Sequence, residues 1–166
     1  LAIADENPEL CDQVFEATVK NLTIAFNSYG KDGGWEGGPD YWAYTTWYSV
    51  LLVDALLTNT GNDFGLSSTT GFDKTGLFPV YNCGTSGKQF TFADGDADDV
   101  HKAYPTLFWL GSHFKIDASI NENHRLLKIS IDNNQSFDAF NLVWYVPAIS
   151  NAAPLPTSRL FSGIDA

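Results

Sequence analysis

A glycine-rich segment between two helical patterns constrains this chain more than any other feature. Residues 30–40 read Gly-Lys-Asp-Gly-Gly-Trp-Glu-Gly-Gly-Pro-Asp, and five glycines in eleven positions argue against both helix and strand. Upstream, Asn7-Pro8-Glu9 suits a helix start, because Asn caps, Pro fits the first helical position and Glu favours the positive end of the helix dipole. Apolar residues then recur at helical spacing up to Gly30: Phe15, Val19, Leu22, Phe26 and Tyr29. We therefore predict a helix followed by a long loop.

A second helix is expected over about 40–59 and is closed by Gly61. It carries five residues on one face: Tyr41, Tyr44, Tyr48, Leu51 and Ala55. A short helix is expected near 70–78, and a short strand over 89–93 after a turn at 85–87.

The last third of the chain again predicts helices. One is expected over 100–114, capped by Asp98 or Asp99, and a second is marked by apolar spacing between Ile120 and Ile131. A third is expected to begin at Ser136 and to stop at Pro147. Residues 1–5 fit the tail of a helix. The sequence thus predicts an all-α fold of helical hairpins joined by long aromatic, glycine-rich loops.

Length and charge exclude several functional classes. The chain has 166 residues, which corresponds to one domain at about 150 residues per domain. No apolar run approaches the roughly 20 residues that a membrane helix needs. The formal net charge is −11, and so negative a surface repels nucleic acid and anionic membranes. We expect neither as a partner.

The two ends of the chain suggest a part of a longer protein. No Met is present, and the opening Leu-Ala-Ile-Ala has no signal-peptide architecture. Residues 152–166 contain Pro154 and Pro156 and are interpreted as a boundary linker. We expect residues 1–166 to form a single helical domain fragment.

The residues best suited to ligand binding or proton transfer are concentrated in the segment 32–44. Glycines let a backbone approach a ligand closely, and the rings of Trp35 and Trp42 offer flat faces for stacking on sugars. Tyr41 and Tyr44 add hydroxyls that can donate or accept a proton. Aromatic residues at spacings of three and four also suit packing in a core, so spacing alone leaves both interpretations open.

The string from residue 32 to residue 44, Asp-Gly-Gly-Trp-Glu-Gly-Gly-Pro-Asp-Tyr-Trp-Ala-Tyr, resembles the loop-and-helix motif of the heparinase II/III-like polysaccharide lyases. Residues 1–5, 90–94 and 155–161 resemble further segments of the same family in the same order. The resemblance implies part of an incomplete (α/α) toroid that precedes a β-sandwich. It implies cleavage of uronic-acid polysaccharides such as heparin, heparan sulfate or alginate by β-elimination, without a cofactor, in the periplasm or outside the cell.

The resemblance also implies roles for individual residues. Tyr41 follows Gly-Pro-x in the motif and is the expected general acid/base, with Tyr44 one turn later as second choice. The family usually has Glu directly before Gly-Pro, whereas here Gly37 holds that position and Glu36 comes one residue earlier. The Asn or His that neutralises the uronate comes in this family from the helix preceding residue 1, and another His from the β-sandwich. We therefore expect this chain to be inactive without those segments of the same protein.

Further candidates complete the expected site. Trp35, Glu36 and Trp42 are assigned to substrate binding, together with His101, the histidine nearest the acidic segment 94–99. An EF-hand loop starting at Asp94 fails, because its sixth and twelfth positions are neither Gly nor Glu. The histidines lack metal-ligand spacing, so no metal is expected.

Two other functions remain open. A glycoside hydrolase needs two carboxylates, and Glu36 with Asp40 could supply them. A non-catalytic carbohydrate-binding module would use Trp35, Trp42 and Tyr41 as platforms. Cys11 and Cys83 allow either one bridge or two free thiols.

Overall fold

The computed structural model describes residues 4–84, 88–95 and 102–162, and this part of the chain is helical. An isolated antiparallel bridge joins Cys83 and Gln89. None of the helices in these ranges has the length and apolarity needed to cross a bilayer. The helices are α1 (Pro8–Phe26), α2 (Gly38–Thr60), the 3-10 helix η1 (Phe72–Leu77), α3 (Phe78–Asn82), α4 (Pro105–Phe114), α5 (Asp117–Asp132) and α6 (Phe140–Val143).

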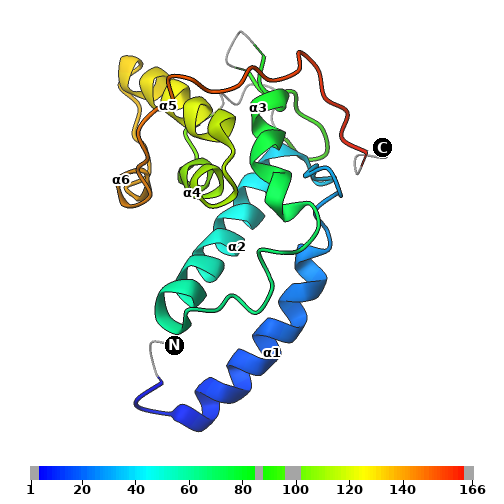
Figure 1. The fold of residues 1–166 in the computed structure, drawn as a ribbon, viewed down its shortest axis with the longest axis vertical. Helices are drawn as coiled ribbons and strands as arrows, with labels where there is room; N and C mark the ends of the chain where they lie inside the picture. The colour runs from blue at the N-terminus through cyan, green and yellow to red at the C-terminus, as the bar shows by residue number, and fades with distance from the viewer. Residues whose placement is uncertain (1–3, 85–87, 96–101, 163–166) are drawn as a thin grey trace.

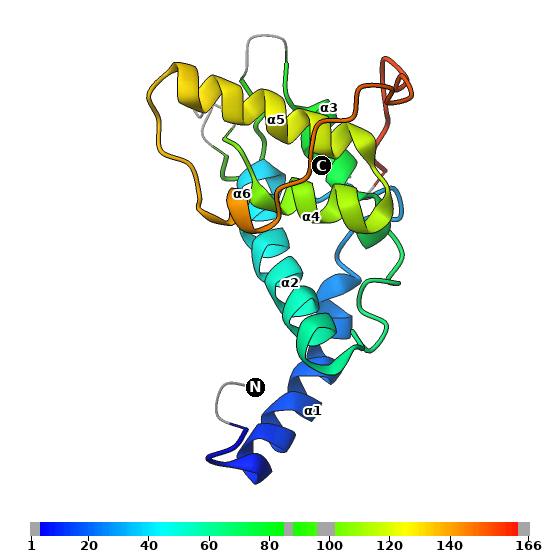
Figure 2. The same cartoon turned by 60° about the vertical axis from the view of Figure 1, so that its left-hand side comes forward.

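The helices form a body from which one hairpin projects. α1 and α2 run antiparallel, and the N-terminal part of α2 enters the body formed by α3, α4 and α5 (Figures 1 and 2). α4 and α5 pack against each other as a tight hairpin. The segment 61–71 runs back along α1 and α2, where Phe64 meets Phe15 edge to face with ring centroids 5.0 Å apart. The projecting hairpin is therefore braced by a loop.

Several helix boundaries follow from local chemistry, as predicted. The Asn7 side chain accepts a hydrogen bond from the Leu10 N–H at 3.1 Å, which confirms the predicted start of α1. α2 ends at Gly61, whose φ of 70° is left-handed. α2 begins two residues before the predicted start, and the short helix near 70–78 is present as η1 and the beginning of α3.

Five predicted segments differ from the structure. α4 begins at Pro105 and not near residue 100, because the residue before a proline is held extended; Tyr104 has φ −108° and ψ 111°. Residues 136–147 form only the single turn α6, preceded by Ala139 and not capped by Ser136. Residues 4–6 form a turn and not the tail of a helix, and α1 ends at Phe26. The expected strand at 89–93 is reduced to the bridge at Gln89, and the turn at 85–87 lies outside the described residues.

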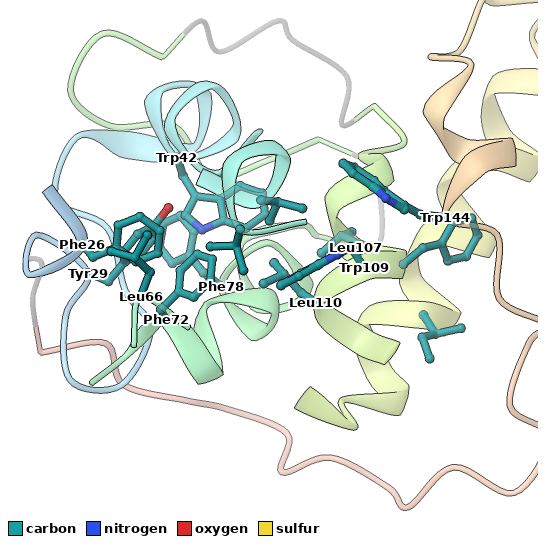
Figure 3. Packing of buried hydrophobic residues seen from close by; sticks show 14 of the residues in the cluster. Phe26, Tyr29, Trp42, Leu66, Phe72, Phe78, Leu107, Trp109, Leu110 and Trp144 are labelled. Atoms are coloured by element: carbon teal, nitrogen blue, oxygen red, sulfur yellow. The ribbon is translucent and has the colours of Figure 1, made fainter. Parts of the chain in front are cut away.

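The core is dominated by aromatic rings (Figure 3). Trp42 is 1% exposed and lies between a group of rings around Phe26 and Phe72 and the apolar side chains of α4. Its indole N–H donates to the hydroxyl of Thr75 at 2.7 Å, and that hydroxyl donates to the Gly33 carbonyl at 2.9 Å. The chain of two hydrogen bonds ties α2 to η1 and to the glycine-rich loop.

A half-buried carboxylate joins α2 to α4 and to the end of α6. Asp54 accepts hydrogen bonds from the indole N–H groups of Trp109, at 2.7 Å, and Trp144, at 3.2 Å. Both indoles are less than 10% exposed, as expected of core residues. Asp54 is thereby fixed as a structural acceptor between α2, α4 and the end of α6.

Residues 152–162 have no regular secondary structure but are held against the body. Tyr81 donates its hydroxyl proton to the Pro156 carbonyl at 3.0 Å. The ring of Phe161 meets that of Phe78 at 5.4 Å and that of Tyr81 at 6.2 Å. This segment passes over α3 toward the glycine-rich loop (Figure 1).

Candidate functional site

The aromatic face predicted for α2 is turned toward solvent. Tyr41, Tyr44 and Tyr48 are 50%, 63% and 56% exposed. The buried face of the helix is a different one, and it is formed by Trp42, Thr46, Ser49, Val50, Val53 and Leu56. These three tyrosines therefore do not pack in the core, and their functional role stays a prediction.

Tyr41 and Tyr44 line one open depression with two carboxylates. The depression has a volume of about 310 Å³, and its lining is completed by Asp40 and Asp94. The Tyr41 hydroxyl donates to a carboxylate oxygen of Asp94 at 3.5 Å, across 53 residues of sequence. The structure therefore places the phenol hydroxyl of Tyr41 within hydrogen-bonding range of a carboxylate.

The approach of the segment 88–95 to α2 depends on Gly38. This residue has a φ of +84°, and a Cβ added to it would lie 2.5 Å from the carbonyl oxygen of Phe92. The side-chain amide of Gln89 then fixes the segment by donating to Asp40 at 3.0 Å. Glycine before the proline of the motif is thus required to place Asp94 beside Tyr41.

The four residues assigned to substrate binding are not gathered here. Trp42 is in the core, so its ring offers no face to a ligand, and this corrects its assignment as a stacking platform. Trp35 is half-buried and packs on Tyr29 with ring centroids 5.0 Å apart. Glu36 is exposed and does not line the depression. His101 lies outside the described residues.

A second, larger depression adjoins the first at Tyr44. It has a volume of about 510 Å³, and its walls include Trp47, Tyr104 and Phe137 together with the side chain of Lys102. Sequence reasoning did not select Lys102, because a lone lysine carries no motif. It did note residues 90–94 as a family-like segment, which was the available signal for Asp94.

The remaining candidates have structural roles. Cys11 and Cys83 are both free thiols and form no disulfide bridge. Burial raises the pKa of the Cys83 thiol, although a hydrogen bond from Arg125 acts to lower it. Arg125 pairs with Glu122 at 2.7 Å, as expected for a lone arginine on a helix surface. His113 stacks on Trp109, and burial lowers the pKa of its imidazole. Within the described ranges, no three His, Cys, Asp or Glu side chains gather closely enough to hold a metal ion.

Two comparisons with known proteins identify no relative of this chain. A search against models of protein families finds no match, and a search of curated proteins finds none. The function is therefore inferred from the geometry of the depression and from the resemblance of residues 32–44.

Proposed function

We propose that this chain is the helical part of a polysaccharide lyase that cleaves a uronic-acid polysaccharide by β-elimination, with Tyr41 as the general acid/base. The observation that carries the proposal is the exposed Tyr41 hydroxyl in an open depression, oriented by Asp94 and flanked by Tyr44. An acid/base group must be accessible to substrate, and among the aromatic residues of the 32–44 motif the two tyrosines meet this condition best.

The residue types suit the chemistry of elimination. A base removes the C5 proton of the uronate, and the electron pair of the C5–H bond forms the C4–C5 double bond as the bond from C4 to the glycosidic oxygen breaks. The leaving oxygen keeps the electron pair of the C4–O bond and takes a proton. The Tyr41 hydroxyl supplies that proton, while Tyr44 lies one turn later on the same exposed face. No cofactor is needed for these steps.

Charge at the site must be balanced for a uronate to bind. Asp40 and Asp94 make the depression anionic, and the Lys102 ammonium borders the adjoining depression across Tyr44. A uronate that spans both depressions places its carboxylate on the Lys102 side, away from the two aspartates. The remaining neutralisation is proposed to come from the Asn or His of an upstream helix, as the family resemblance implies.

The toroid belongs to the same proposal. α1 exposes three apolar side chains, Leu10, Val14 and Ile24, at 44%, 56% and 70%. A toroid built from repeated hairpins covers such faces with neighbouring helices, whereas this chain leaves them in solvent. We therefore propose that other segments of a periplasmic or secreted protein complete the ring.

A glycoside hydrolase is the second candidate, and one observation favours it. Two carboxylates, Asp40 and Asp94, line the same depression, whereas the predicted partner Glu36 does not. Hydrolysis needs such a pair, and elimination does not. A carbohydrate-binding module would use the same exposed tyrosines without turnover.

Product analysis separates these functions. The full-length protein is incubated with heparan sulfate, chondroitin, alginate and neutral polysaccharides, and ultraviolet absorbance is followed together with release of reducing ends. The lyase produces both signals, because only elimination leaves a 4,5-unsaturated uronate that absorbs. Reducing ends without absorbance identify a hydrolase, and binding without either signal identifies the module.

A further inference from the structure

The described residues form a further pocket of about 440 Å³. It is bounded by α3, by the rings of Phe90 and Phe92, and by residues 159–161 of the C-terminal segment. Most of its wall is aromatic, since Phe78, Tyr81 and Phe161 also line it. It shares no lining residue with the depression that contains Tyr41.

Two residues that line this pocket each carry a buried hydrogen-bond donor without a partner. The Asn82 side chain is 9% exposed, and its amide nitrogen makes no hydrogen bond. The Nε of Arg159 is likewise buried and unpartnered. Buried donors are nearly always satisfied in folded proteins, so two of them on residues of one pocket point to an acceptor that binds there.

The positive charge of Arg159 indicates that the acceptor is an anion. Its Nη2 donates to the backbone carbonyl of Asp32 at 3.0 Å, and its guanidinium lies over the Phe161 ring at 5.4 Å. These contacts hold the group in place without neutralising it, and no carboxylate of the described ranges lies within ion-pair distance of it. A carboxylate satisfies both the charge and the free N–H, because its two oxygens can each accept a hydrogen bond.

The aromatic wall defines the rest of the ligand. Phe78, Phe92 and Phe161 offer ring faces and edges, which suit a flat ring or the C–H face of a sugar. We propose that this pocket is a binding site for a ring that carries one carboxylate, with the carboxylate on Asn82 and Arg159 and the ring against the phenylalanines. Two sources share this chemistry, an aromatic acid and a uronate.

The test is direct observation of the two donors by proton–nitrogen correlation NMR. Benzoate and glucuronate are the carboxylate probes, and benzyl alcohol and glucose are their neutral counterparts. The carboxylates are expected to shift the Arg159 Nε–H and the Asn82 side-chain amide signals saturably, and the neutral compounds are not. A response to benzoate alone assigns the pocket to aromatic acids, and a response to glucuronate alone assigns it to uronates.

Variants test the assignment of the donors. Asn82→Asp replaces the amide by a negative charge of the same shape and is expected to weaken carboxylate binding at least about tenfold, since charge-assisted bonds are the strong ones. Asn151→Asp makes the same charge change at an exposed position and is expected to bind like the wild type. Arg159→Lys keeps the charge but lacks Nε, and it should also lose about tenfold.

The proposal fails if neither carboxylate moves the two signals, if the neutral compounds bind equally well, or if Asn82→Asp binds like Asn151→Asp while folded by circular dichroism. It is independent of the lyase assignment. Tyr41→Phe is expected to leave binding at this pocket unchanged, so a failed elimination assay and a failed binding assay are distinguishable.

Discussion

Replacing Thr75 by valine tests the hydrogen-bond chain that holds the N-terminal part of α2. Thr75 is fully buried, accepts the Trp42 indole N–H and donates to the Gly33 carbonyl. Valine has nearly the same shape, so the substitution removes two hydrogen bonds with little change in packing. Each buried group left unsatisfied costs about 1–3 kcal/mol, which gives a loss of about 3 kcal/mol in the free energy of unfolding.

The loss is measured by urea unfolding followed by circular dichroism, with Thr70→Val as the matched control at an exposed position. Surface substitutions of this kind usually stay within about 0.5 kcal/mol. For a chain of this size a loss of about 3 kcal/mol corresponds to a fall in Tm of roughly 6–12 °C. If Thr75→Val differs from Thr70→Val by less than about 0.5 kcal/mol, the hydrogen-bond chain does not stabilise this part of α2 and the reasoning is refuted.

Three other predictions concern the framework of the site. Gly71→Ala should lower the free energy of unfolding in urea by at least about 2 kcal/mol more than Gly65→Ala. Both glycines have a positive φ, but only a Cβ at residue 71 would meet the Gly30 carbonyl oxygen, and equal losses for the two variants would contradict this. Asp54→Leu should cost about 2 kcal/mol, since it leaves two indole N–H groups without an acceptor, and unchanged stability would disprove that role. Burial acts to raise the pKa of Asp32, but hydrogen bonds from Ser162 and Gly34 outweigh it and lower the pKa. The stabilisation that Asp32 contributes is therefore present above pH about 4 and is lost as pH falls through the lowered pKa. The stability difference between wild type and Asp32→Asn should therefore shrink on acidification, and a constant difference from pH about 7 to 2 would contradict this.

The helices that sequence predicted best are those with local boundary signals. Asn7 and Pro8 determine the start of α1, and Gly61 ends α2, because caps and left-handed residues act within a few positions. The helix over 100–114 is expected to begin near residue 100 because Asp98 or Asp99 could cap it, and both aspartates lie outside the described residues. In the structure the proline at 105 decides the backbone of the residue before it, and a capping signal carries no information about that effect.

The site was predictable only in part, for a physical reason. α2 has aromatic residues on both its buried and its exposed faces, so spacing does not say that Trp42 faces inward and Tyr41 outward. That choice is made by tertiary contacts, above all the acceptor that Thr75 offers to the Trp42 indole. The approach of Asp94 likewise depends on Gln89 and Gly38, which act across more than 45 residues.

We propose that the exposed hydroxyl of Tyr41 performs the acid/base chemistry of the lyase. The most direct measurement compares Tyr41→Phe with Tyr48→Phe in the full-length protein, by the rate of ultraviolet absorbance increase on uronate polysaccharides. Tyr48 is exposed on the same face but does not line the depression, so it controls for loss of a surface hydroxyl. We predict a fall in kcat of about 100-fold or more for Tyr41→Phe and near-wild-type activity for Tyr48→Phe. Equal activity of the two variants, or no absorbance change with any uronate polysaccharide, would contradict the claim.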